Sequence, residues 1–538
     1  KMRYLKALVQ VREIKNSILL GGTTVTALRR RATQAHLVRH VLCSFVVVLL
    51  LASTTADVSR ITIDFAAQPT GTFNASHFSV GQGGFTTSPG WAGHAAAITA
   101  LRPSTIRVFV QTYYLLPSGA VNFEALDANV ALIRATGATP LLTLVFKPAS
   151  IFGPVNATIC LPRTPAGWDA WRALVSTVAL RYASKTSSML YEVLNEPDFG
   201  ERGGTPFLCN ASQYVSLFAA TAAALRAADP SCAVGGPATA HYSSPIIPAL
   251  TSYLAAAGYD PLSTFISWHH YAREPSEFAS QTRAVRAAVA TAWSALRAEA
   301  APPPVFLDEW GAAGLGGCGG EATPWTPARQ AAFLVESIDQ LRRANVSRAI
   351  HYSIKDVVQR DGMEQCSNFL SAPTCTALRV AWTRAPVCYG LFDELGSPRI
   401  SYFAARLVAR MSGVVHATSP SSAAVQYRNA ARSSDAGVRA LVTSDAELGI
   451  VSILVWGWTA NATRMSLTLR HLHDPSNASA TSALLRCVEL SSVPQPGGVN
   501  SALAPLATTE IALPTGSFEV DLAPFGVAYC YSAVVPLA

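Results

Sequence analysis

Between residues 77 and 354 the sequence alternates short apolar runs with longer stretches rich in alanine, leucine and arginine, and this alternation limits the fold more than any other feature. The apolar runs have the length and composition of strands, whereas the intervening stretches suit helices. The predicted strands are 77–81, 105–110, 139–145, 189–195, 233–236, 265–270, 305–309 and 349–354. Helices are expected at 168–183, 212–228, 278–298 and 327–344. Eight strands separated by helices predict an α/β fold, a (β/α)8 TIM barrel.

The chain beyond this barrel has a different pattern. A last helix is expected at 401–411, and short β-rich segments with turn residues between them then follow at 449–456, 464–472, 482–490 and 526–532. This pattern predicts a β-sandwich. Residues 60–65 also alternate as a strand, ahead of the barrel, and we expect them to pair with the β module. We therefore divide the chain into a leader strand at 57–75, the barrel at 76–412 and the sandwich at 413–538. Glycine-, cysteine- and proline-rich loops are expected at 311–326 and 359–388, where they would shape a binding site.

The first 56 residues have the order of a secretory leader. The formal net charge of +8 is confined to the first 40 residues, so the remainder is neutral and has no general affinity for nucleic acid. An apolar run at 41–52 follows, and small residues continue to Ala56. Because the run is short for a membrane span, we expect cleavage near Ala56, with no stable membrane contact. The protein would then be secreted or enter the endolysosomal lumen; an uncleaved segment would be a signal anchor.

Glycosylation acceptors and cysteines fit a secreted chain. The Asn-x-Ser/Thr acceptors are Asn74, Asn156, Asn210, Asn345, Asn461 and Asn477. Of the ten cysteines, Cys43 lies in the leader, so an odd number remains and at least one is unpaired or pairs elsewhere. Cys487 and Cys530 lie in the same module and are expected to form a disulfide. No Cys-x-x-Cys or His-Glu-x-x-His spacing occurs, which argues against a zinc site.

Two of the predicted barrel strands end in glutamate. Glu196 lies where Pro197 ends the fourth strand, and Glu309 ends the seventh. The carboxyl ends of the strands of a parallel barrel meet at one mouth, where its catalytic side chains gather. Glycosidic bond cleavage needs an acid that protonates the leaving oxygen and a second carboxylate across the sugar. Glu196 suits the first task and Glu309 the second.

Five other side chains are candidates for the same site. Asn195 can hold a sugar hydroxyl, and His269 and Tyr271 project from one face of a strand because they are two residues apart. The tyrosine could orient a carboxylate nucleophile, and the histidine could bind substrate hydroxyls. Arg107, on the second strand, could keep a glutamate ionised, or could form a structural ion pair. Trp310 could be a sugar platform or a core residue.

The motif Asn195-Glu196-Pro197 after strand four, together with Glu309 after strand seven, resembles the clan A glycoside hydrolases. Within this clan, residues 191–198, 234–240, 265–271, 389–393 and 396–399 resemble family 39, which contains β-xylosidases and α-L-iduronidases. The resemblance covers roughly residues 57–420. It departs from many relatives at Asp308, where they have threonine, and at Leu194, where tryptophan is common. These departures leave both catalytic groups in place but alter the surroundings of the substrate.

The resemblance implies a retaining double displacement, with Glu196 as acid/base, Glu309 as nucleophile, and neither metal nor organic cofactor. The substrate would be an oligosaccharide, polysaccharide or other glycoside, with terminal β-xylosides as the leading expectation. An α-L-iduronidase or another clan A exo-glycosidase is the alternative, and Arg273 could then meet a uronate carboxylate. A catalytically silent carbohydrate-binding barrel is the alternative from another class. The presence of both glutamates argues against it.

Overall fold

The computed structural model describes residues 58–73, 78–83, 89–183, 189–313, 325–356, 366, 370–384, 389–419, 437–473, 480–490, 503–505, 508–532 and 535–536. The expected leader at 1–56 lies outside the described residues, as do Asn74 and Asn477. No helix in the described ranges combines the length and apolar character that crossing a bilayer requires.

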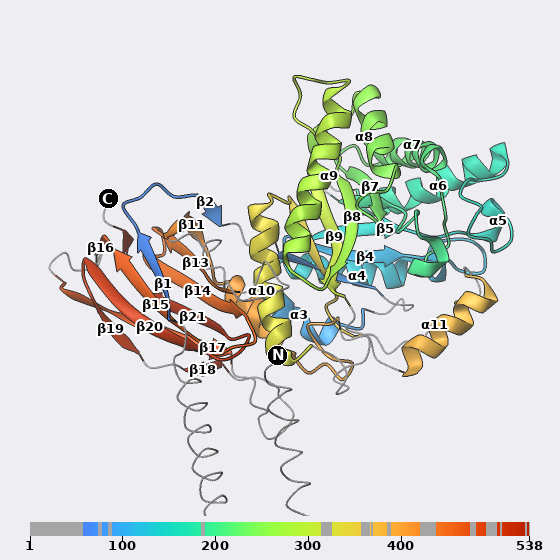
Figure 1. Ribbon diagram of the computed structural model, residues 1–538. Coiled ribbons are helices and arrows are strands. Elements are labelled where there is room, and N and C mark those ends of the chain that lie inside the picture. Colours follow the sequence, from blue (N-terminus) through green and yellow to red (C-terminus); the bar gives the residue numbers. More distant parts are fainter. Residues whose placement is uncertain are drawn as a thin grey trace, which may run out of the picture. The chain divides into compact units, whose positions relative to one another are not determined.

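The predicted TIM barrel is confirmed (Figure 1). Eight parallel strands close in the order β10-β3-β4-β5-β6-β7-β8-β9. Their bounds are β3 Phe78–Gln82, β4 Thr105–Val110, β5 Thr139–Leu144, β6 Leu190–Val193, β7 Ala233–Thr239, β8 Ile266–Ala272, β9 Val305–Ala312 and β10 Arg348–Tyr352. Closure rests on the pairing of the last strand with the first, which places Ala349 beside Phe78. Every barrel strand overlaps the range expected from the sequence.

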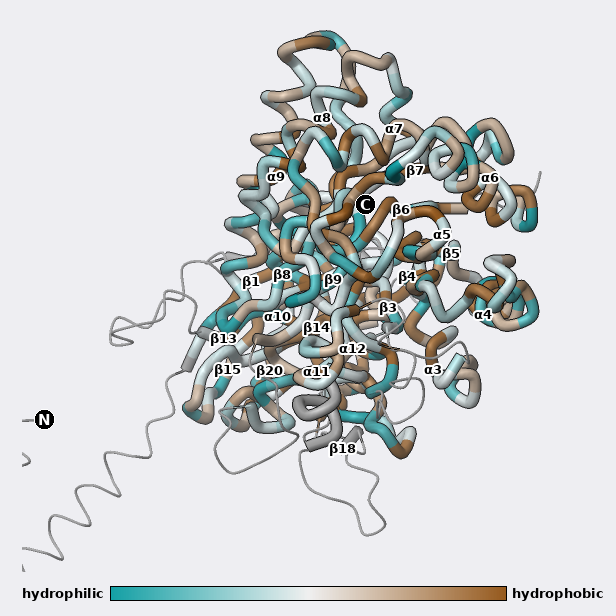
Figure 2. Tube along the Cα trace, turned by 90° about the vertical axis from the view of Figure 1, so that its right-hand side faces the viewer, coloured by the Kyte–Doolittle hydropathy of each residue, from teal (hydrophilic) through white to brown (hydrophobic). Residues whose placement is uncertain are grey.

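Helices connect the barrel strands and cover them from outside. Their bounds are α3 Ala95–Thr99, α4 Phe123–Ala135, α5 Ala149–Phe152, α6 Pro165–Tyr182, α7 Ala211–Ala228, α8 Ile246–Ala256, α9 Ser276–Ser294, α10 Pro327–Arg343, α11 Ala372–Arg384 and α12 Ile400–Val408. Asn210 begins α7 with a reciprocal capping box to Gln213, and Thr164 caps α6. Both hydrophilic and hydrophobic residues occur along these helices (Figure 2), as expected for elements with one face on the barrel.

The prediction of a loop at 359–388 is wrong in part, because this segment contains helix α11. The proline that suggested irregular structure, Pro373, is the second residue of that helix. Proline is tolerated in a first helical turn, where its missing N–H has no intrahelical partner to lose.

The barrel interior is built in layers. An apolar layer consists of Leu141, Leu190, Phe265, Phe306 and Ile350. Two residues further along the same strands lie Thr143, Glu192, Ser267, Asp308 and Tyr352. Because strand side chains alternate, residues two apart face the same side, so a polar layer follows the apolar one toward the carboxyl ends. The sequence thus places charged groups directly above a hydrophobic floor.

A β-sandwich accompanies the barrel, as predicted. One sheet has the order β12-β1-β15-β20, and the other has the order β18-β17-β21-β14-β13-β11-β2, with β19 paired to β17. The bounds are β1 Val58–Asp64, β2 Gly71–Phe73, β11 Gly413–His416, β12 Thr418–Ser419, β13 Gly437–Asp445, β14 Ile450–Trp458, β15 Thr463–Arg470, β16 Leu472–His473, β17 Ser482–Leu490, β18 Leu503–Pro505, β19 Thr509–Ala512, β20 Thr515–Leu522, β21 Val527–Ser532 and β22 Val535–Pro536. β1, which overlaps the strand expected at 60–65, pairs in parallel with β15. Ile61 and Leu467 from one sheet share a core with Val442 and Ile453 from the other.

Disulfides link Cys160 with Cys209, Cys366 with Cys375, and Cys487 with Cys530. The last of these confirms the pairing expected within the sandwich. Cys232 is a free, buried thiol, which is consistent with the odd number of cysteines.

A buried carboxylate on α10 joins the barrel to the sandwich. Glu336 is fully buried, accepts a hydrogen bond from Trp456 Nε1 at 2.6 Å, and forms an ion pair with Arg439 at 2.9 Å. Both partners belong to sandwich strands, β14 and β13. Residues Val58 to Ala538 accordingly form one compact unit.

Replacing Glu336 with alanine should destabilise the whole unit, because it leaves the buried Arg439 guanidinium and the Trp456 N–H without their acceptor. We expect a loss of about 3–5 kcal/mol in the free energy of unfolding, measured by chemical denaturation. Glu336→Gln keeps an acceptor for the tryptophan and should lose less. Equal stability of Glu336→Ala and the wild-type protein would show that this contact does not hold the two parts together.

Candidate active site

Glu196 follows β6 on an irregular turn at the barrel mouth. Leu194 and Glu196 both have positive φ, at 66° and 42°, so the chain leaves the strand direction there. The turn is held by the Glu196 N–H, which donates to Ala238 O at 2.8 Å, and by the N–H groups of Phe199 and Gly200, which donate to the Glu196 carbonyl. One bond to β7 and two bonds within the turn thus fix the backbone that carries the Glu196 side chain.

Glu309 reaches the site because β9 carries an extra residue. Trp268 of β8 pairs with Leu307, but the next residue, His269, pairs with Glu309. The pairing of β9 with β10 shifts at the same place. Such a bulge breaks the alternation of side chains. Asp308 and Glu309, although adjacent, therefore both contact Arg107, at 3.3 and 2.9 Å.

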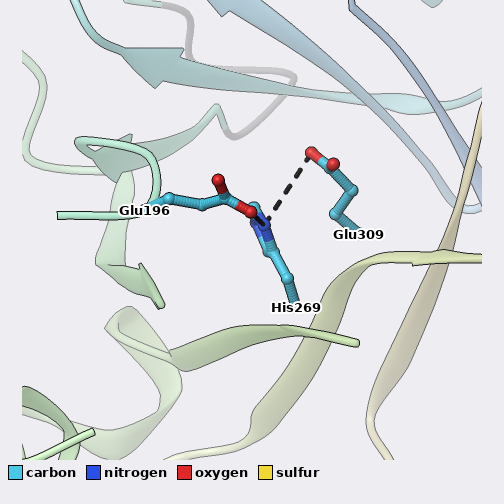
Figure 3. Close-up of side chains that lie close together, drawn as sticks. All are labelled: Glu196, His269 and Glu309. Atoms are coloured by element: carbon cyan, nitrogen blue, oxygen red, sulfur yellow. Dashed lines mark hydrogen bonds and ion pairs between the residues drawn. The ribbon is translucent and has the colours of Figure 1, made fainter. Parts of the chain in front are cut away.

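The two glutamates face each other across a short gap (Figure 3). His269 lies beside them, with Nδ1 2.9 Å from Glu196 Oε1 and 3.9 Å from Glu309 Oε2. One side-chain ligand atom from each of the three residues lies within 4.8 Å of the others. The strands that carry Glu196 and Glu309 thus bring two carboxyl groups from distant parts of the sequence within reach of one sugar carbon.

Glu309 is held by two hydrogen-bond donors. The Tyr271 hydroxyl donates to Oε1 at 2.8 Å, and Arg107 Nη1 donates to Oε2 at 2.9 Å. Burial and the nearby Glu309 charge raise the pKa of Tyr271 well above its ordinary value, so the phenol stays protonated and remains a donor. Both carboxylate oxygens of Glu309 are therefore oriented, and the charge is stabilised.

Glu196 has a different environment. Burial raises the pKa of its carboxyl, the hydrogen bond and charge of His269 lower it, and the charges of Glu309 and Asp198 raise it again; the net shift is upward. Asp198 also fixes the β7 loop, because its Oδ1 accepts from the Ala240 N–H at 2.9 Å. The two glutamates thus have different surroundings: two donors hold Glu309, whereas the pKa of Glu196 is shifted upward.

Arg107 connects several side chains of the site through hydrogen bonds. It is buried and donates through Nε to Glu192 Oε2 at 2.8 Å, through Nη2 to Asn195 Oδ1 at 2.6 Å, and through Nη1 to Glu309. Burial by itself would lower the pKa of Arg107, but the neighbouring carboxylates outweigh it and raise that pKa. The guanidinium therefore stays charged and fixes the side chains of three other residues.

The site brings together most of the residues predicted from the sequence. Glu196, Glu309, Asn195, His269, Tyr271 and Arg107 are linked by direct contacts. In this arrangement Asn195 accepts a bond from Arg107, so its oxygen is engaged with the protein.

Of the two roles considered for Trp310, the sugar platform is wrong and the core residue is confirmed. Its side chain is fully buried and packs against Phe278 and His351, with ring centroids 5.3 and 5.0 Å away. The bulge at Asp308 and Glu309 turns the next residue outward, toward the helices. A tryptophan in the core cannot stack on a sugar.

The sequence analysis assigned no role to several other residues that lie at the site. Tyr389 packs beside Tyr271, with ring centroids 5.1 Å apart, and Tyr352 lies near both. Asp198 directly follows Pro197. No spacing rule marks these residues, because loops and the barrel closure bring them to the mouth.

Glu196, His269 and Glu309 are close enough together to contact one metal ion. Arg107, however, places a permanent positive charge 2.9 Å from Glu309. A second cation in this space would be repelled, so we assign no metal to these residues.

The chain was compared with known proteins. The family described as "Glycosyl hydrolases family 39" matches residues 117–425. A β-xylosidase from Caldicellulosiruptor saccharolyticus is 23% identical over 315 residues, which cover 54% of this chain and 57% of that protein. The chain thus spans little more than half the length of this relative.

Solved structures show the same fold. A monomeric β-xylosidase from Caulobacter crescentus CB15 has a TM-score of 0.63 at 16% identity, covering 89% of this chain and 100% of that one. A family 39 enzyme from Xanthomonas axonopodis pv. citri has a TM-score of 0.62 at 16% identity, covering 90% and 98%. A glucosidase from Croceicoccus marinus has a TM-score of 0.60 at 16% identity, covering 89% and 100%.

Replacing Arg107 with methionine should destabilise the protein most where its carboxylate partners are ionised. We expect a loss of about 3–5 kcal/mol near neutral pH. The loss should shrink on acidification, because protonation neutralises the unpaired carboxyl groups. Arg107→Lys keeps the positive charge but not the planar guanidinium, so it should lose less stability than Arg107→Met. Denaturation at neutral and acidic pH measures the difference, and a loss independent of pH would contradict this account.

Proposed function

The chain belongs to glycosyl hydrolase family 39, and from that membership we propose that it hydrolyses terminal glycosidic bonds with retention, by a double displacement in which Glu196 is the acid/base and Glu309 the nucleophile. The observation that carries this proposal is the approach of a Glu196 oxygen and a Glu309 oxygen to within 4.8 Å. Retaining enzymes hold their carboxyl groups about 5–5.5 Å apart, whereas inverting enzymes leave about 6.5–9.5 Å for a water molecule.

In the first step Glu309 attacks the anomeric carbon as Glu196 protonates the leaving oxygen. The hydrogen bonds from Tyr271 and Arg107 orient the Glu309 side chain for this attack. The Glu196 carboxyl group supplies the proton to the leaving oxygen, and its raised pKa favours this acid role. Attack consumes the Glu309 charge, which is one of the influences that raise this pKa. In the glycosyl-enzyme the pKa of Glu196 therefore falls, and the residue can act as a base toward water.

The substrate class follows from the relatives and from the charges of the site. The Caldicellulosiruptor saccharolyticus and Caulobacter crescentus proteins are β-xylosidases, which favours a terminal β-xyloside. An α-L-iduronide remains the alternative and requires a cation for the uronate. Arg107 is engaged by carboxylates of the protein itself, and Arg273 has an exposed position beyond β8. A neutral pentoside thus suits the described residues better than a uronide.

The protein is further proposed to be secreted, or to enter the endolysosomal lumen, and to be glycosylated. Four of the acceptor asparagines lie at exposed positions: Asn156, Asn210, Asn345 and Asn461. The disulfides also suit an oxidising compartment.

Replacing Glu309 with alanine should reduce the hydrolysis of aryl β-xylosides to background, because no covalent intermediate can form. Azide should restore turnover by entering the space of the missing carboxylate. It would attack from the face that Glu309 occupied, so the glycosyl azide should have the anomeric configuration opposite to the substrate, as NMR would show. Glu447→Ala, at an exposed turn of the sandwich, is the matched control and should remain active. Normal hydrolysis by Glu309→Ala would reject the assignment.

Replacing Glu196 with alanine should slow substrates according to their leaving groups. Alkyl glycosides, which need protonation, should lose about 10²–10⁴-fold in kcat/KM, whereas dinitrophenyl glycosides should lose far less. Azide should now yield the retained anomer, because it attacks the glycosyl-enzyme from the side of Glu196. Equal losses for all leaving groups would count against an acid role.

A further inference from the structure

Strand β14 of the sandwich has two buried faces, and one of them packs with the barrel. Ile453 and Val455 belong to the core of the sandwich. Leu454, Trp456 and Trp458, which alternate with them, belong to the hydrophobic cluster that fills the barrel. Side chains two residues apart on a strand face the same side. Because β14 runs beside α10 (Figure 1), both tryptophans point toward the barrel.

The two tryptophans have acceptors in different parts of the barrel. Trp456 Nε1 donates to Glu336 of α10, on the outside of the barrel. Trp458 Nε1 donates to Glu274 Oε2 at 3.0 Å. Glu274 lies in the turn between β8 and α9, which begins at the carboxyl end of β8. Of these two bonds, the second therefore reaches the mouth of the barrel, where the catalytic glutamates lie.

The turn that contains Glu274 continues a strand of the active site. β8 carries Tyr271, whose hydroxyl donates to Glu309. Glu274 follows Tyr271 by three residues. The N–H groups of Arg273 and Glu274 both donate to Glu277 Oε1, at 3.1 and 3.0 Å. The turn is thus held by α9 as well as by the sandwich.

The Trp458 side chain is fixed by its neighbours. Arg329 Cζ lies 5.3 Å from the centroid of the Trp458 ring, 4.7 Å from that of Trp325 and 5.6 Å from that of Phe525. The ring of Phe525, also from the sandwich, lies 5.3 Å from Trp458, and the ring of Phe333 lies 6.0 Å away. A guanidinium is attracted to aromatic faces at such distances. The indole is 4% exposed, so its N–H has a defined direction toward Glu274.

The same group of side chains holds the strand that carries Glu309. Trp325 Nε1 donates at 3.1 Å to the carbonyl oxygen of Ala313, the residue after β9. The Ala313 N–H donates at 2.7 Å to the carbonyl oxygen of Ala272, the last residue of β8. The carboxyl ends of β8 and β9 are therefore joined to each other and to the aromatic group at the edge of the sandwich.

We propose that Trp458 of the sandwich is a positioning residue of the active site: its hydrogen bond to Glu274 holds the carboxyl end of β8 and so directs the Tyr271 hydroxyl toward Glu309. The sandwich then contributes to catalysis as well as to stability. The proposal rests on the proposed function for the role of Glu309 as nucleophile. Trp458 itself is buried and acts through β8.

The experiment compares two variants that each remove one buried indole N–H from β14. Trp458→Phe loses the bond at the mouth, whereas Trp456→Phe, the matched control, loses the bond to Glu336. Both variants should unfold at lower denaturant concentrations than the wild-type protein.

Under native conditions the two variants should differ in turnover. Trp458→Phe should lower kcat for aryl β-xylosides by about 10-fold or more with little change in KM, because displacing a catalytic group by about 1 Å can cost about 10²-fold. Trp456→Phe should keep the wild-type kcat. Wild-type kcat in folded Trp458→Phe, or an equal loss in Trp456→Phe, would overturn the proposal.

Variants of Glu274 test the same bond from the barrel side, should Trp458→Phe not fold. Glu274→Ala removes the acceptor and should lose as much kcat as Trp458→Phe. Glu274→Gln keeps a side-chain carbonyl oxygen and should recover most of this loss. Combining Glu274→Ala with Trp458→Phe should lower kcat no further than either change alone, because both remove one interaction. Additive losses would contradict the proposal.

Hydrogen exchange provides a measurement that does not depend on turnover. The amides of Arg273 and Glu274 are hydrogen-bonded in the turn after β8, so their exchange reports on its opening. They should exchange several-fold faster in Trp458→Phe than in the wild-type protein or in Trp456→Phe. Unchanged exchange would overturn the proposal, whatever the substrate. The proposed function fails separately, through normal hydrolysis by Glu309→Ala.

Discussion

The site depends on one buried cation. Arg107 lies among the carboxyl groups of Glu192, Asp308 and Glu309, which come from two strands that are not neighbours of β4 in the barrel. Several carboxylates in a space with little water would otherwise repel each other strongly. The guanidinium makes the cluster possible, and its planar fork gives each partner a fixed direction. The orientation of Glu309 and of Asn195 is therefore a consequence of where β4 places this arginine.

The barrel provides the frame in which that charge cluster can exist. An apolar floor of leucine, phenylalanine and isoleucine closes the interior below, and the polar layer follows two residues higher on the same strands. The floor excludes water from one side, so the buried charges must satisfy one another. The same lack of solvent raises the pKa of Glu196 and differentiates it from Glu309. The sandwich, joined to α10 through Glu336, stabilises the outside of this frame without contributing a described residue to the cluster.

Family membership and site geometry support each other from independent directions. The sequence match extends over residues 117–425, whereas the solved structures cover nearly the whole described fold at low identity. A fold shared at 16% identity does not specify a reaction. The contacts of Glu196, His269 and Glu309 bear on the chemistry more directly, because they place two carboxyl groups close together in different surroundings.

The sequence by itself determined the barrel strands, the β-sandwich and the two glutamates at strand ends. These features are encoded locally, in side-chain periodicity and in the proline that ends a strand, and so they can be read without coordinates. The bulge in β9 could not be predicted in this way, because it arises from pairing with β8 and β10. That bulge decided that Asp308 and Glu309 face inward together and that Trp310 turns into the core. Likewise, only the closed barrel brought Arg107 to Glu192 and to Glu309, since contacts between distant strands depend on register and curvature rather than on local sequence.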